Sequence, residues 1–169
     1  MRILFLMFPG DAEISLLRLG LLAPAYYLFK DLPADVVLAS PLGGSPMASA
    51  GEHETRGDDV RRFLGDRMAR EELADTLMVD QLVIDDFDAA YCLGLVGAIW
   101  KQAGTERVVS QFLDAGKPVA IIPGAVVDIS PHGAANGLLI IGDNDASPLL
   151  AARALIELLQ QKPHKRMPS

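Results

Sequence analysis

Residues 116–125 read GKPVAIIPGA, and this stretch decides the fold. The four residues from Val119 to Ile122 form an unbroken apolar run of strand length, which is typical of a strand buried on both faces of a parallel sheet. Gly116 stands where the preceding helix should end, because glycine readily adopts the left-handed conformation of a helix C′ residue. Pro123 and Gly124 then turn the chain at the carboxyl end of the strand. In open parallel sheets this edge holds ligands and catalytic groups, so we expect a site there.

The turn itself carries no reactive side chain. No Ser, Cys, His, Asp or Glu lies between Val119 and Val127. A nucleophile or a general base at this edge must therefore come from another loop.

Outward from this strand, apolar runs and helical periodicities alternate along the chain. Helix-like patterns occupy 14–30, 60–74, 97–115 and 147–160, with Pro24 predicting a kink in the first, and the segment 42–58 reads as a loop. Further strands are expected at 2–8, 36–39, 88–92 and 138–141. This alternation predicts an α/β fold with a parallel sheet and right-handed crossovers. We assign 1–161 to one domain and 162–169 to a polar tail.

Composition and charge exclude several classes of partner. Fifteen basic and 22 acidic residues give a net charge of −7, which argues against nucleic acid or an anionic membrane as a partner. No apolar run reaches the roughly 20 residues that span a bilayer. Cys92 is the sole cysteine, so an internal disulfide or a cysteine-based metal site is excluded. We expect a cytoplasmic protein without a cofactor.

The helix expected at 14–30 is apolar nearly all round. Such a helix is either buried within its own chain or covered partly by a second subunit. On this ground the sequence predicts a homodimer through the first helix.

Four stretches together resemble the ThiJ/PfpI superfamily, the DJ-one group within the class I glutamine-amidotransferase-like fold. They are 23–29 (APAYYLF) with 37–41 (VLASP), then 86–89 (DFDA), then 115–120 (AGKPVA), and last 136–147. The resemblance covers most of the chain and implies a three-layer, flavodoxin-like sandwich with a mostly parallel sheet. Members of the family usually have several tens of residues between the elbow and the last strand. This chain has only 123–137, so it resembles a shortened member.

The resemblance also shows which family residues this chain lacks. Family members place a Cys-His pair after the elbow strand, where this chain has Pro123 and Gly124. Their Pro-Gly-Gly-His-Gly turn after the third strand, which donates oxyanion-type hydrogen bonds, reads LGLVG at 93–97. The helper Glu of the first helix falls near Gly20 and Leu21, or on Ser15 under a tighter alignment. The family's cysteine chemistry should therefore not be carried over.

The remaining polar residues leave alternatives open. Asp11 and Glu13 follow the first strand and act either as charges at a helix N-terminus or as a pocket acid or base. Asp128 and His132 are either surface residues of a loop or an acid/base pair folded over the pocket. Cys92 is either a small core hydrophobe or a working thiol.

We also considered a metal site at 52–54 (EHE). The three residues are consecutive in a flexible loop, so we expect none.

These residues define the predicted site and the predicted function. The catalytic candidates are Asp11, Glu13, Asp128 and His132, and the pocket-lining candidates are Ser15, Cys92, Leu95, Val96, Pro123, Gly124 and Ala125. The sequence predicts an apolar, repurposed pocket that binds or converts a small, mostly apolar metabolite without a cysteine nucleophile. If it is an enzyme, acid/base chemistry of the lyase, isomerase or cyclase type is expected, not that of a cysteine hydrolase or glyoxalase. The alternative is a non-catalytic pseudoenzyme: a dimeric structural, regulatory or holdase-like protein.

Overall fold

A six-stranded sheet forms the middle of the molecule. The structure is a computed structural model that describes residues 1–7, 17–46, 48–49, 56–95, 104–123, 139–141 and 147–161. The strand order is β5-β3-β1-β6-β7-β8, and every neighbouring pair is parallel. The strands are β1 (Arg2–Met7), β3 (Asp35–Ser40), β5 (Leu77–Met78), β6 (Ala89–Leu95), β7 (Val119–Pro123) and β8 (Leu139–Ile141). Without the edge strand β5 this is the 2-1-3-4-5 order of flavodoxin-like folds, so the predicted fold class is confirmed.

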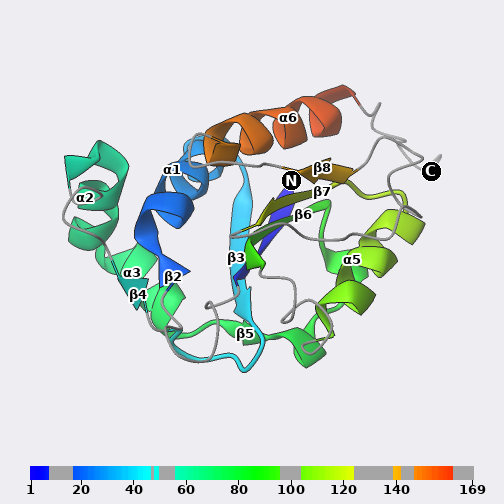
Figure 1. Cartoon of the computed structure of the whole chain (residues 1–169), viewed down its shortest axis with the longest axis horizontal. Coiled ribbons are helices and arrows are strands. Elements are labelled where there is room, and N and C mark those ends of the chain that lie inside the picture. Colours follow the sequence, from blue (N-terminus) through cyan, green and yellow to red (C-terminus); the bar gives the residue numbers. More distant parts are fainter. Residues whose placement is uncertain are drawn as a thin grey trace.

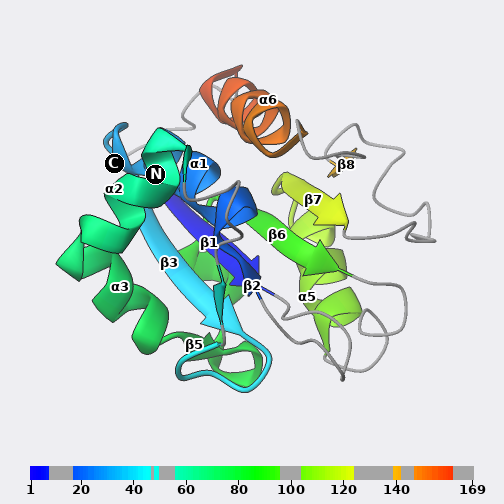
Figure 2. The same cartoon turned by 60° about the vertical axis from the view of Figure 1, so that its left-hand side comes forward.

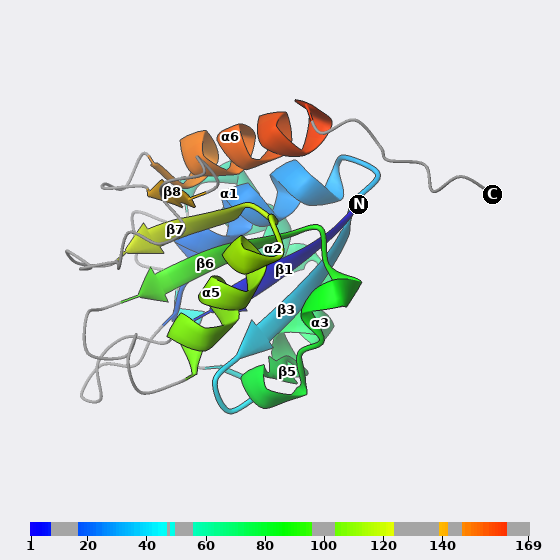
Figure 3. The same cartoon turned by 90° about the vertical axis from the view of Figure 1, so that its right-hand side faces the viewer.

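Helices cover both faces of this sheet and make three layers (Figures 1 and 3). On one face lie α1 (Leu19–Lys30) and α6 (Ser147–Gln161), flanked by α2 (Asp58–Gly65) and α3 (Arg67–Ala74). On the other face lies α5 (Thr105–Asp114).

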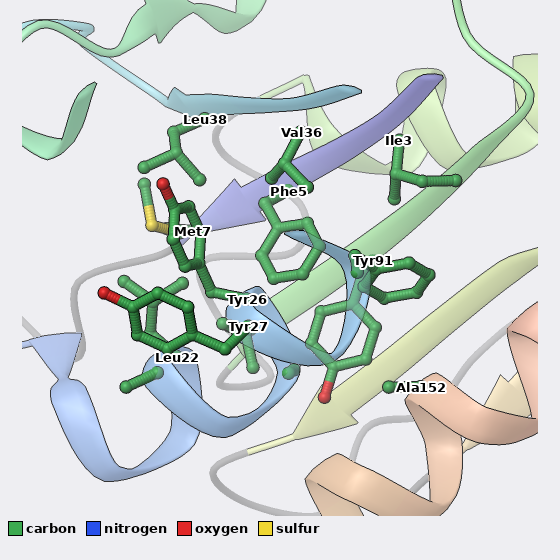
Figure 4. Close-up of a cluster of buried hydrophobic side chains, with 14 of the residues drawn as sticks. Ile3, Phe5, Met7, Leu22, Tyr26, Tyr27, Val36, Leu38, Tyr91 and Ala152 are labelled. Carbon is green, nitrogen blue, oxygen red and sulfur yellow. The ribbon is translucent and has the colours of Figure 1, made fainter. Parts of the chain in front are cut away.

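The strand β1 shows why its sequence, RILFLM, is apolar throughout. Ile3, Phe5 and Met7 point into the cluster beneath α1 and α6 (Figure 4), whereas Leu4 and Leu6 belong to the cluster beneath α5. All five side chains are buried, as the two-sided burial of a central parallel strand requires.

The turn that leads into β7 has the geometry expected from the sequence. Gly116 has φ 67°, the left-handed conformation that glycine tolerates best. Its amide donates to the carbonyl of Leu113, and the amide of Lys117 donates to that of Phe112 at 2.8 Å. These two bonds form a Schellman motif, so the prediction that Gly116 ends the helix is confirmed.

Several predicted boundaries were wrong. The helix expected from residue 14 begins at Leu19, because Leu17–Arg18 form a short strand, β2, that pairs with β4 (Ala48–Ser49) inside the expected loop. The single helix expected at 60–74 is two helices, because the extended backbone of Asp66 interrupts it. The third strand extends to Leu95, and β5 was not anticipated at all. The segment 97–103, expected to be helical, lies outside the described residues.

The helix α1 is buried mainly by its own chain. It packs against α6 and α2 (Figure 2), and its apolar side chains enter the core. Its Tyr26 hydroxyl donates to Glu72 of α3 at 2.6 Å, and its Tyr27 hydroxyl donates to Asp66 at 3.0 Å. Contacts within one chain are thus enough to explain why this helix is apolar. The homodimer stays a prediction.

Candidate functional site

The topology fixes which edge of the sheet should hold a ligand. The chain passes from β1 through α1 on one face to β3, whereas α5 follows β6 on the opposite face. The strand order therefore reverses between β1 and β6, and in such sheets ligands bind in the crevice at the carboxyl ends of the two strands. Figure 3 shows the arrowheads of β6, β7 and β8 at this edge.

Two of the predicted lining residues meet there. Leu95 closes β6 and Pro123 closes β7, and the two are register partners in the sheet. The register shifts between Leu93 and Leu95, so the end of β6 is irregular where it reaches the site. Irregularities of this kind are common beside functional sites because they re-aim a side chain or end the pairing.

Most of the other candidates lie outside the described residues. They are Asp11, Glu13, Ser15, Val96, Gly124, Ala125, Asp128 and His132. The segment in which the sequence suggests a deletion, 123–137, lies outside them as well except for Pro123. The acid/base roles of these residues therefore stay predictions.

Cys92 lies inside the sheet rather than at its edge. Its side chain is 0% exposed, and it belongs to the core cluster on the α5 face. It is the register partner of Leu6 in β1 and of Ile121 in β7, both apolar neighbours. This burial favours the small core hydrophobe over a residue that lines an open pocket.

Burial also determines the chemistry of this thiol. Loss of solvent raises the pKa of Cys92 to about 12, because the thiolate cannot be solvated there. The thiolate is the nucleophilic form, and reactive cysteines occupy electropositive, partly exposed positions. Cys92 has neither property.

We expect Cys92 to resist thiol reagents in the folded protein. Labelling with 5,5′-dithiobis(2-nitrobenzoic acid) should require global opening, so it should run at least about a thousandfold slower than in guanidinium, given typical stabilities. As a control, Met68→Cys in a Cys92→Ala background places a thiol at an exposed position of α3 and should label rapidly. Rapid labelling of native Cys92 would contradict the burial.

No group of three or more His, Cys, Asp or Glu side chains suited to a metal ion occurs among the described residues. Within the same part of the chain, no helix is long and apolar enough to cross a membrane.

The comparisons with known proteins agree with this geometry. No protein-family model matches the sequence, and no curated protein matches it. Among solved structures, the Rapid Encystment Protein 24 kDa of Francisella tularensis matches with a TM-score of 0.68 at 13% identity, over 94% of this chain and 99% of that one. A ThiJ/PfpI domain protein from Brachyspira murdochii matches with a TM-score of 0.65 at 15% identity, over 96% and 98%.

The chain has the ThiJ/PfpI fold. A two-domain protein from Anabaena variabilis with DJ-1/ThiJ/PfpI-like and ferritin-like domains matches as well, with a TM-score of 0.58 at 11% identity. That match covers all of this chain and 53% of the Anabaena protein. Because these identities are low, the matches show the ThiJ/PfpI fold alone, and the fold is compatible with many chemistries.

Proposed function

We propose that this protein binds a small, mostly apolar metabolite non-covalently at the carboxyl edge of β1, β6 and β7. The observation that carries the proposal is the position of its only thiol. Cys92 is fully buried between β1 and β7, which supports a site without a cysteine nucleophile at the switch point, the sheet edge where the strand order reverses between β1 and β6. Any reaction there would depend on acid/base groups, for which Asp11, Glu13, Asp128 and His132 are the candidates.

The character of the ligand follows from the residues at the strand ends. Leu95 and Pro123 are register partners at the ends of β6 and β7, and both are apolar residue types. Val96 and Ala125, which are also apolar, follow them in the sequence. Small-molecule sites are mostly apolar with a few polar groups that fix orientation, which suits this composition.

The test introduces a carboxylate beside the proposed ligand. Val96→Asp should leave the circular dichroism spectrum unchanged and weaken binding of the neutral fluorescent probe N-phenyl-1-naphthylamine by about tenfold or more, because the carboxylate must lose water when the probe enters. The matched control is Leu150→Asp, the same kind of change at an exposed position of α6, which should leave binding unchanged.

A second variant keeps this test decisive. If Val96→Asp does not fold, Ala125→Asp takes its place with the same expected loss. If a folded variant binds the probe as tightly as the unsubstituted protein does, the working surface lies elsewhere. The non-catalytic structural or regulatory protein is then favoured.

A further inference from the structure

A hollow lies where α1 begins, away from the switch point. It has a volume of about 300 Å³, is open to solvent on one side, and is bordered by the start of α1, the segment around β4, and the helices α2 and α3. These elements gather at one side of the molecule in Figure 1. The volume is at the lower end of the range for small-molecule sites.

The residues that line this hollow are apolar apart from Ser45 and Arg70. Leu19, Phe63 and Leu73 are buried residues whose side chains line it from three different helices. Leu64 and Ala74 contribute at more exposed positions. Side chains from three helices that leave an apolar hollow between them form a surface suited to a short hydrocarbon chain or ring.

One residue of this lining, Arg70 of α3, is charged. The other arginines of α2 and α3 all have carboxylate partners: Arg61 pairs with Asp58, Arg62 with Asp31 at 2.7 Å, and Arg67 with Glu71 at 2.7 Å. By contrast, the guanidinium of Arg70 makes no hydrogen bond or ion pair with any other described residue.

The acidic neighbours of Arg70 are committed to other groups. Asp66, one turn earlier, accepts hydrogen bonds from the backbone amide of Ala69 and the hydroxyl of Tyr27. Glu72 accepts from Tyr26 and from Lys30 of α1, at 2.6 and 2.8 Å. Among the described residues, the acids that flank Arg70 on α3 already have partners, so Arg70 is a cation at this hollow without a carboxylate of its own.

We propose that this hollow binds a small apolar carboxylate. The hydrocarbon part occupies the space between Leu19, Phe63 and Leu73, and the carboxylate pairs with the guanidinium of Arg70. Arginine suits this role because its planar fork binds a carboxylate through two parallel hydrogen bonds. A single cation matches a monoanion, whereas a phosphate or a nucleic acid would require more donors than the hollow offers.

The probe for this proposal is octanoate, with 1-octanol as its uncharged counterpart. We expect octanoate to bind with a dissociation constant of about 1 mM or tighter, and to shift the methyl NMR signals of Leu19 and Leu73. Arg70→Gln should weaken octanoate binding about tenfold or more and leave octanol binding unchanged, because only the charge-assisted pair is removed.

The matched control is Arg67→Gln, the same substitution one turn earlier on α3, at a side chain that pairs with Glu71 and does not line the hollow. It should leave octanoate binding unchanged. Both arginines are exposed, so both variants should fold. If both variants lost the same octanoate affinity, the effect would come from the overall surface charge and not from Arg70 itself. That result would overturn the proposal.

A filling variant gives an independent readout. Ala74→Trp should occupy the hollow and abolish the binding of octanoate and of octanol alike. Retained octanoate binding in a folded Ala74→Trp protein, or no octanoate binding by the unsubstituted protein, would also overturn the proposal. These results test the hollow and not the site at the ends of β1, β6 and β7. Val96→Asp, which changes that other site, should leave octanoate binding unchanged.

Discussion

Phe5→Ala should lower the free energy of unfolding by about 3–5 kcal/mol, the usual cost of removing a buried aromatic side chain. Phe5 lies in the central strand β1 and is 0% exposed. Its ring stacks on that of Tyr91 (Figure 4) with 4.9 Å between centroids, and meets the ring of Phe29 edge-on at 5.6 Å. One substitution therefore removes contacts to β6 and to α1 together and leaves a cavity in the centre of the larger core cluster.

The measurement is equilibrium unfolding in urea, followed by circular dichroism. The loss is large against a total stability of about 5–15 kcal/mol, so the variant should unfold at a markedly lower urea concentration. Leu42→Ala is the control: Leu42 is 86% exposed, and its removal should change stability by about 0.5 kcal/mol or less. A similarly small change for Phe5→Ala would show that this core is not packed as described.

The second large effect is a loss of stability at alkaline pH. Burial raises the pKa of Cys92 to about 12, and burial also raises the pKa of Tyr91, whose hydroxyl donates to the carbonyl of Pro148 at 2.8 Å. In the unfolded chain both groups ionise near their ordinary pKa values, 9.0 for the thiol and 10.0 for the phenol. Between these values and the raised ones, the unfolded state binds fewer protons than the folded state does.

The sign of the effect follows directly from this proton difference. A raised folded-state pKa means that stability is fully present below the unfolded pKa and is lost as the pH rises toward the folded pKa. Each group costs about 1.4 kcal/mol per pH unit in that window. From about pH 8 to about pH 11 the two groups together should lower the free energy of unfolding by about 4 kcal/mol.

Two variants isolate the contributions of Cys92 and Tyr91 to this pH dependence. Urea unfolding at several pH values should give a shallower decline for Cys92→Ala than for the unsubstituted protein, although the variant starts from a slightly lower stability. Tyr91→Phe should flatten the decline above about pH 10 in the same manner. If the decline over this range is the same in all three proteins, the two groups are not buried as the structure places them.

The sequence predicted the position of some of the proposed binding residues and not of others. Leu95 and Pro123 end neighbouring strands, and two runs of apolar residues with turn signals were enough to bring them to one edge. Arg70 gave no such signal. In the sequence, RMAREELA reads as an ordinary solvated helix face, and only the packing of α1, α2 and α3 shows that this arginine borders a hollow.

The sequence by itself determined the class of fold and the central strands. Apolar runs such as ILFLM and VAII fit best in the middle of a covered parallel sheet, and Gly116 before the second run indicated where a helix ends. Only the tertiary structure decided the pairing of β2 with β4, the break at Asp66, the edge strand β5 and the burial of Cys92. These features depend on contacts between residues far apart in the chain, such as the hydrogen bond from Tyr27 to Asp66 across 39 positions. Local propensity carries no information about such contacts, because each partner favours its final conformation only once the other is in place.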